Sequence, residues 1–526
     1  MNNIFSRIKA LSFMMLALAF ASCNDFLDKN PDDRTEIDTP EKVAKLLGSA
    51  YPDKTINFLT EFCSDNVMDN GKTFQYAKEQ EEVYRFEQVT QTGNDSPKSV
   101  WSEHYNIVVT TNEALAAIEK IGLTEETKPL KAEALLCRAY AIFSLTNCFC
   151  MAYNDTTANK YLGIPYPKKV GEIVGKRGTL AETYANINAD IEEALPLLDD
   201  SYLKVPAYHF NERAAYAFAA RFNLYYQKWG KAKEYAEIAL GSNPLNIMHT
   251  SLATYPAMDL KTAKNAYIDS SDPYNFLLVS KYSAMGRARN FTTYNRFGHN
   301  VELCEKETLW SDLLWNGTNG SSTLYEASLT YGSDQSIYTP AVVEFFETTD
   351  KINQTGFAHI IDVPFTSDET CLVHAEACIA LNELDLALND MNNFAKIHCS
   401  ASSGNAVRPV YTLKNLVAFW KSISPYKLNA EGDVINRSNK KIFHAPFKIV
   451  DENQEAMVYT VLQMRRIETL WKGMRFQDIK RYGIEFSHNL DGEKPLVFKT
   501  GDLRGAIQLP QEVIVAKTGG LEPNPR

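Results

Sequence analysis

The stretch that most constrains the fold is Arg213 to Pro244, which has the pattern of two antiparallel helices. Its first half is dense in alanine, the best helix former and small enough to let a partner helix approach closely. Trp229 and Gly230 mark the predicted turn, and Pro244 follows the end, where it cannot continue the helix. An ordinary helical hairpin would fit, but the small residues have the tetratricopeptide spacing. They are Ala220, Ala232, Ala236 and Ala239.

The same spacing returns later in the chain. The step from Ala375 to Ala387 equals the step from Ala220 to Ala232. An internal repeat of this kind favours stacked hairpins. The predicted fold is therefore mainly α, with little sheet and a scaffold of tetratricopeptide-like helical hairpins. The scaffold is expected at about residues 100–244 and 367–480.

A large irregular region, at about residues 245–340, separates the two scaffold segments. Helical periodicity fades there, and Tyr, Asn, Gly and Ser become frequent. Long irregular insertions in a rigid scaffold are where binding loops tend to lie. The aromatic and amide side chains of interest in it are Trp310, Trp315, Tyr331, Tyr338, Asn316 and Asn319.

The N-terminus has the form of a secretory signal peptide. Arg7 and Lys9 precede a short apolar run, which ends in small residues directly before Cys23. Such a segment is too short to remain as a membrane span. A cysteine at this point resembles a bacterial lipoprotein lipobox, although Phe20 stands where Leu is usual; ordinary secretion is the alternative.

Three parts of the chain follow from this interpretation. We predict a lipoprotein signal peptide over residues 1–22, a lipidated flexible tether over 23–37 and a single domain over 38–526. Asp25 and Asp28 look like the acidic signal that sends some lipoproteins to the cell surface.

Charge and cysteine spacing exclude several classes of partner. The net charge of -11, without a long basic run, argues against a nucleic-acid partner. The eight cysteines beyond Cys23 show no Cys-x-x-Cys and no paired Cys/His spacing, so no metal site is expected. Most should be buried, and one or two disulfides remain an alternative in an exported protein.

Motifs for catalysis and for cofactors are not found. The chain has no phosphate-binding loop, no His-Glu-x-x-His and no Gly-x-Ser-x-Gly, so we expect neither an enzyme nor a cofactor. Arg465, Arg466 and Glu468 stand at helix-neighbour spacing, which favours a structural ion pair.

Five short segments, in this order, together resemble the SusD/RagB family of outer-membrane nutrient-binding lipoproteins. They span nearly the whole chain. One departure is the tail, which ends in Pro-Asn-Pro-Arg where the family often continues with Gly-Tyr. The five segments are Cys23–Pro31, Trp101–Leu115, Ala132–Leu145, Arg465–Gly483 and Ile507–Arg526.

The resemblance implies a non-catalytic lipoprotein, anchored by its lipid in the outer membrane and facing the cell exterior. It also implies a TonB-dependent transporter barrel as partner, over which the protein sits as a lid and to which it delivers nutrients. In the family the hairpins mostly contact the transporter and the irregular region holds the ligand, usually a glycan and sometimes a peptide. A peptide-binding RagB-like protein and a secreted glycan-processing enzyme are the alternatives.

Candidate ligand residues follow from the chemistry of a sugar ring. Its apolar face lies on an aromatic ring, while amides and charged groups bind its hydroxyls. We expect at least one of Trp310, Trp315, Tyr331 and Tyr338 to stack on ligand, with Asn316 and Asn319 beside them. For each single ring a core position is the alternative. The other candidates are Phe74 and Tyr76, and Trp101, whose helix could bury it.

Overall fold

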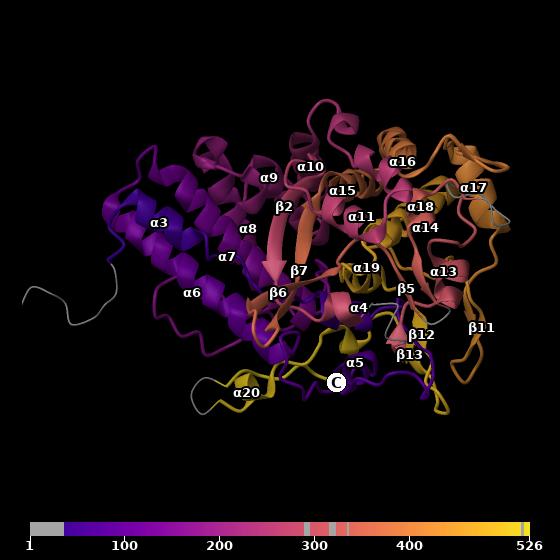
Figure 1. The fold of residues 1–526 in the computed structure, drawn as a ribbon, viewed down its shortest axis with the longest axis horizontal. Helices are drawn as coiled ribbons and strands as arrows, with labels where there is room; N and C mark the ends of the chain where they lie inside the picture. The colour runs from indigo at the N-terminus through magenta and orange to yellow at the C-terminus, as the bar shows by residue number, and fades with distance from the viewer. Residues whose placement is uncertain (1–35, 289–294, 315–321, 334–335, 517–519) are drawn as a thin grey trace, which may run out of the picture.

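Long helices dominate the structure, a computed structural model (Figure 1). The mainly α fold predicted from the sequence is therefore confirmed. The structure describes residues 36–288, 295–314, 322–333, 336–516 and 520–526. The long helices are α6 (Pro97–Ile121), α7 (Thr127–Phe149), α8 (Leu180–Ala194), α9 (Glu212–Tyr225), α10 (Trp229–Leu240), α15 (Ser367–Ala380), α16 (Leu384–His398) and α18 (Glu452–Glu468).

The ends of these helices are set by local capping. Thr179 precedes α8, and its hydroxyl accepts a hydrogen bond from the Glu182 backbone N–H at 3.1 Å. The Glu182 carboxylate accepts one in return from the Thr179 N–H at 2.7 Å. This capping box satisfies two N–H groups that the first helical turn would leave without partners.

Most of the helix contacts join consecutive helices, and α10 and α15 pack together although they are distant in sequence. Helix α6 contacts α7, α9 contacts α10, and α15 contacts both α10 and α16. In Figure 1, α6 to α8 lie at one end of the molecule, α9 and α10 in the middle, and α16 and α18 toward the other end. The predicted turn at Trp229 lies slightly earlier, because Trp229 begins α10 and Gln227 takes the left-handed conformation, with φ of 60°. The tetratricopeptide likeness remains a prediction.

One three-stranded sheet lies against the hairpins. Its antiparallel order is β2 (Asn275–Lys281), β7 (Thr355–Thr366), β6 (Glu344–Asp350). The other strands form two-stranded pairs. They are β1 (Met68–Asp69) with β3 (Phe297–Gly298), β4 (Tyr331–Ser333) with β5 (Ser336–Tyr338), β8 (Ser402–Ser403) with β9 (Ala406–Val407), β10 (Lys427–Leu428) with β11 (Val434–Asn436), and β12 (Phe486–His488) with β13 (Leu496–Phe498).

Short helices complete the fold. The short α-helices are α3 (Pro40–Leu47), α4 (Asn57–Phe62), α5 (Lys78–Tyr84), α11 (Leu260–Tyr267), α12 (Met285–Ala288), α13 (Val301–Glu307), α14 (Tyr325–Ser328), α17 (Leu413–Ser422), α19 (Arg475–Tyr482) and α20 (Gln511–Ile514). Helices α11 to α14 lie in the segment 245–340 that the sequence marks as irregular, where they alternate with loops and short strands.

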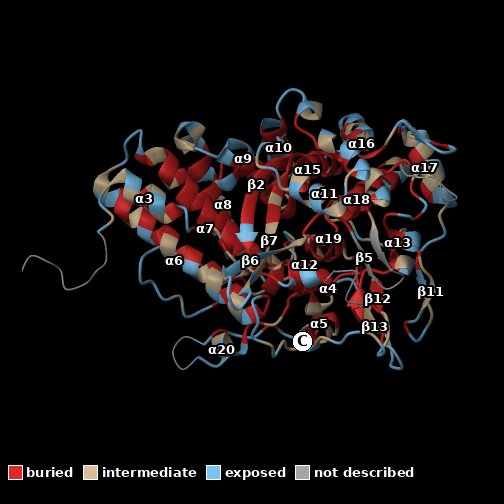
Figure 2. Ribbon diagram, in the orientation of Figure 1, coloured by how far each residue is buried: buried red, intermediate tan, exposed pale blue. Residues whose placement is uncertain are grey.

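The core between scaffold and loops is charged as well as apolar. Buried residues run through the centre of the fold in Figure 2, and Arg465 and Arg466 of α18 are among them. Their partners lie on other elements, not at Glu468. The nearest pairs are Arg465–Glu369 and Arg465–Asp478, both 3.1 Å, Arg466–Glu307 at 2.8 Å and Glu468–Lys472 at 3.1 Å.

The cysteines of the described residues are all buried, and seven of them form no disulfide: Cys63, Cys137, Cys148, Cys150, Cys304, Cys371 and Cys378. Burial raises the pKa of Cys63 to about 12, so this thiol stays protonated and unreactive. No helix within the described ranges is long and apolar enough to pass through a membrane. The predicted signal peptide and most of the predicted tether, including Cys23, lie outside the described residues.

Candidate functional site

Two of the loop stretches singled out in the sequence lie side by side in the structure. Strand β1 pairs with β3, and Gln75 bridges to Asn295 just beyond. The Asn70 N–H donates to the Arg296 carbonyl at 2.7 Å, and the Arg296 N–H donates to the Gln75 carbonyl at 2.9 Å. The loop with Phe74 and Tyr76 is therefore fastened to the chain that leads into α13.

A buried ion pair holds the base of this loop. The Arg296 guanidinium donates to both carboxylate oxygens of Asp69, at 2.8 and 2.7 Å. Burial acts to raise the pKa of Asp69, but the hydrogen bonds from Arg296 and from backbone N–H groups hold it below its ordinary value. Asp69 therefore remains a carboxylate, and the fork geometry of arginine fixes both residues.

Tyr76 presents its ring to solvent while its hydroxyl is held. The side chain is 52% exposed, and its hydroxyl donates to Glu81 Oε2 at 2.8 Å. That hydrogen bond raises the pKa of Tyr76. Phe74, two residues earlier, is half-buried. A ring fixed at one edge and open on its face is suited to stacking, because little side-chain freedom is lost on binding.

Trp310 is held in a similar way. It lies just after α13, is 39% exposed, and its indole N–H donates to the Ala327 carbonyl of α14 at 3.2 Å. Its backbone N–H donates to the Cys304 carbonyl at 2.9 Å. The sequence suggested this ring by composition alone; the anchoring contacts come from α13 and α14.

The remaining candidates divide into three cases. Trp315, Asn316 and Asn319 lie outside the described residues. Tyr331 and Tyr338 are opposite one another in the β4–β5 pair. Trp101 of α6 is buried. The centre of its ring lies 5.0 Å from that of Tyr105 on the same helix and 5.5 Å from that of Phe149 on α7, so it packs in the core.

Sequence reasoning did not find Glu81 or Arg296, the charged residues that orient this face. Glu81 accepts hydrogen bonds from Tyr76 and, at 3.0 Å, from Arg85 Nε. Arg296 Nη1 lies 3.4 Å from the same Glu81 oxygen. A single Glu within a charged helix gives no signal of this role, because its partners are distant in sequence.

A separate cleft of about 320 Å³ lies between the loop after α7, α19 and the chain near Thr500. Lys480 lines it, and burial lowers the Lys480 pKa to about 8. Its ammonium donates to the Asn147 and Cys150 carbonyls at 2.6 and 3.1 Å. These carbonyls lie at the C-terminus of α7, so Lys480 caps that helix.

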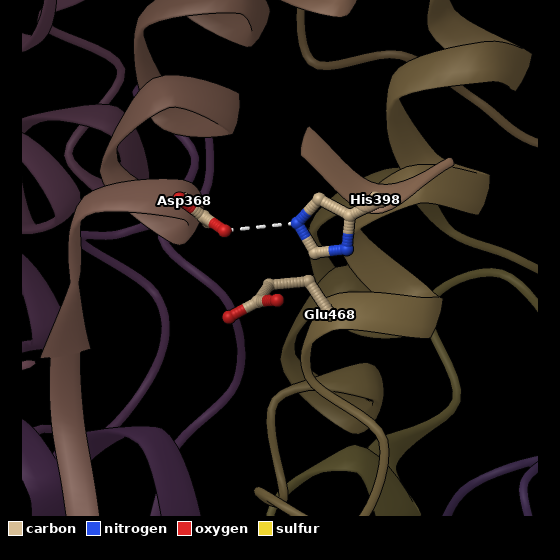
Figure 3. A group of neighbouring side chains, drawn as sticks. All are labelled: Asp368, His398 and Glu468. Carbon is tan, nitrogen blue, oxygen red and sulfur yellow. Dashed lines mark hydrogen bonds and ion pairs between the residues drawn. The ribbon is translucent and has the colours of Figure 1, made fainter. Parts of the chain in front are cut away.

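Asp368, His398 and Glu468 form the cluster best suited to a metal among the described residues (Figure 3). Their donor atoms lie within 4.8 Å of one another, and all three residues are buried. His398 Nε2 is 2.9 Å from Asp368 Oδ2, and the other ring nitrogen bonds Glu326. Burial acts to lower the His398 pKa, but the two carboxylates raise it to about 10.

As they stand, the three side chains form ion pairs with their neighbours. A metal ligand must be a neutral imidazole, so a histidine with a pKa of about 10 would first have to lose a tightly held proton. The third member, Glu468, is already paired with Lys472. The arrangement is therefore a set of ion pairs that joins α14, α15 and α16.

Comparison with known proteins finds one family model and a set of solved structures to which this chain is similar. Residues 25–224 match the model of a SusD-like family described as starch-binding and associating with the outer membrane. No curated protein sequence matches the chain.

Solved structures share the fold over most of its length. A proposed sugar-binding protein from Bacteroides vulgatus has a TM-score of 0.65 and 17% identity, covering 94% of this chain and 99% of that one. A SusD superfamily protein from Bacteroides thetaiotaomicron has a TM-score of 0.62 and 16% identity, covering 93% and 100%. A SusD-like carbohydrate-binding protein from Bacteroides vulgatus has a TM-score of 0.56 and 15% identity, covering 88% and 89%. At these identities the likeness establishes a shared fold.

Proposed function

We propose that this chain is a non-catalytic outer-membrane lipoprotein that binds glycan nutrients, because residues 25–224 match the SusD-like family model and the fold is shared with a SusD superfamily structure. It passes them to a TonB-dependent transporter barrel, and it is anchored through Cys23 with its loops toward the cell exterior. The family description, starch-binding and associating with the outer membrane, supports the ligand class and the location. The transporter partner and the anchor rest on the sequence resemblance.

The observation that carries the proposal is the pair of half-open aromatic rings, Tyr76 and Trp310. Each is held at its polar edge, by Glu81 and by the Ala327 carbonyl, and each leaves ring surface in solvent. A sugar places its C–H face on such a ring and its hydroxyls near amides and charged groups. Exposed aromatic side chains of this kind serve a binding surface better than a core.

The carboxylate that holds Tyr76 has a positioning role. Glu81 accepts hydrogen bonds from Tyr76 and Arg85, and Arg296 lies beside it. A general acid would need a proton, and a nucleophile would need a free oxygen aimed at the sugar. A carboxylate held by two cations and a phenol supports binding without cleavage.

Retention without cleavage is the direct test. Purified protein is mixed with maltoheptaose, chosen because the family is described as starch-binding, and then with a panel of other oligosaccharides and peptides. Calorimetry measures binding and chromatography of the ligand measures cleavage. We expect an oligosaccharide to bind and to be recovered intact. Cleavage would indicate an enzyme, and retention of peptides alone would indicate a peptide-binding protein.

Matched variants locate the site. Tyr76→Ala and Trp310→Ala should each weaken binding of the retained oligosaccharide by roughly tenfold, the effect of losing about 1.4 kcal/mol of stacking. The control is Tyr208→Ala, because Tyr208 is also 52% exposed but lies on the helical scaffold. Binding unchanged in both site variants, with melting temperatures preserved, would place the ligand elsewhere.

A further inference from the structure

A cavity of about 70 Å³ lies where the helical scaffold, the three-stranded sheet and the α18–α19 turn meet. Its wall comes from α7, α9, β2 and β7, and from the chain between Lys472 and Gln477. It is separate from the candidate aromatic rings, because Phe74, Tyr76 and Trp310 do not line it. The sequence gives no motif at this place.

Two polar side chains in this wall have side-chain atoms with no hydrogen-bond partner among the described residues. Gln477 is 4% exposed, and neither its amide nitrogen nor its amide oxygen has a hydrogen-bond partner among the described residues. Tyr225 is 3% exposed, and its hydroxyl likewise bonds to no described group. Buried polar atoms without partners are destabilising, and folded proteins satisfy nearly all of them. A molecule in the cavity that offers both donors and acceptors would satisfy these atoms.

The charged groups of the wall leave no net charge for an ionic ligand. Each cation of the wall has a carboxylate partner. The pairs are Lys281–Asp362 at 3.0 Å, Arg221–Glu369 at 2.8 Å and Lys472–Glu468 at 3.1 Å. His104, also in the wall, is neutral because burial lowers its pKa to about 3. Burial raises the pKa of Tyr225 to about 12, so this side chain remains a hydroxyl.

We propose that this cavity is a binding site for small neutral molecules that carry hydroxyl groups, either ordered water or a polyol about the size of glycerol. A hydroxyl can accept from the Gln477 amide nitrogen, donate to its oxygen and do either with Tyr225. Phe143, Val363 and Met474 supply apolar wall for the C–H groups of a polyol. The volume suits about five waters, at roughly 10–15 Å³ each, and leaves no room for an oligosaccharide.

Two crystal structures test the proposal and separate its two sources. One crystal is grown and frozen without any polyol, and the other is soaked in glycerol. We expect oxygen density within hydrogen-bonding distance of the Gln477 amide and the Tyr225 hydroxyl in the first. Glycerol density in the second assigns the site to polyols, and unchanged water assigns it to water. An empty cavity in both, or Gln477 turned onto protein groups, overturns the proposal.

The melting temperature gives an independent test in solution. If the cavity is filled, Tyr225→Phe and Gln477→Leu each remove a bond to the bound molecule, and the melting temperature falls by about 1 °C or more. If the cavity is empty, the same variants remove unpartnered polar atoms and the melting temperature rises. Tyr411→Phe is the control, because its buried hydroxyl also lacks a partner among the described residues but does not line this cavity. A rise in both cavity variants overturns the proposal.

Discussion

Arg466 of α18 and Glu307 of α13 form a buried ion pair, with 2.8 Å between Nη1 and Oε2. The two side chains are 1% and 0% exposed. Glu307 also bonds Lys441 at 2.6 Å and Arg437 at 3.0 Å, so one carboxylate faces three cations. Because α13 leads directly to Trp310, this pair ties the candidate binding face to the last long scaffold helix.

Removal of the Glu307 carboxylate should destabilise the protein strongly. Glu307→Ala leaves three buried or nearly buried cations without this partner, and we expect a loss of about 3 kcal/mol or more. Chemical denaturation at neutral pH measures it. The control is Glu302→Ala, whose carboxylate is 53% exposed and lies 2.7 Å from the same Arg437. Equal stability of the two variants would show that burial adds nothing to the Glu307 pairs.

The same group predicts an acid-dependent loss of stability. Burial acts to raise the Glu307 pKa, but Lys441, Arg466 and Arg437 lower it from 4.5 to about 2. A lowered folded-state pKa stabilises the protein fully above the unfolded value, and the contribution is lost as the pH falls from about 4.5 towards 2. Unfolding measured across this range should show a smaller pH dependence in Glu307→Ala than in the wild type.

His398 predicts a loss of stability at alkaline pH. Its folded-state pKa of about 10 lies above the ordinary 6.5, so its contribution is complete below about pH 6.5 and disappears as the pH rises to about 10. His398→Gln should lower the free energy of unfolding at pH 6 by roughly 3 kcal/mol and reduce the slope above pH 7. Part of the slope remains, since Asp390 raises the His374 pKa to about 10 as well. An unchanged slope would mean that His398 is neutral.

A substitution at Ala236 tests how closely the helices of the hairpins pack. It is fully buried on α10, which packs against α9 and α15. Ala236→Trp should cost about 1–3 kcal/mol or more, because a packed interface cannot admit a large ring without moving a helix. Ile238→Trp on the same helix, at a position 44% exposed, is the control. Wild-type melting of Ala236→Trp would show that the α10 interface has spare room.

A substitution at Cys23 tests the proposed lipid anchor. Cys23→Ala should remove the lipid and release the protein from membranes, because one peripheral domain without its acyl chains has no apolar anchor. Mass spectrometry of the mature N-terminus and membrane fractionation check this. A variant that stays membrane-bound, or a wild type that begins at another residue, would contradict lipidation at this cysteine.

The sequence by itself determined the helical scaffold and the stretches where exposed rings occur. Alanine density, caps such as Thr179 and the small-residue spacing around Ala236 act within a few residues, so their effect does not depend on the rest of the chain. The same local patterns marked Tyr76 and Trp310 as members of loop-rich segments. They could not separate these rings from Trp101, because exposure depends on what packs against a helix.

Only the tertiary structure decided which distant residues meet. Arg465 and Arg466 were expected to pair near Glu468 on their own helix, yet their carboxylates come from α13, α15 and α19. The loop of Tyr76 meets the chain before α13 through β1 and β3, and Gln477 shares a cavity with Tyr225. The sequence alone does not say which Arg pairs with which Glu, because every such pair has the same chemistry. The partner is chosen when the packing of the apolar helix faces brings particular segments together and removes their charges from water.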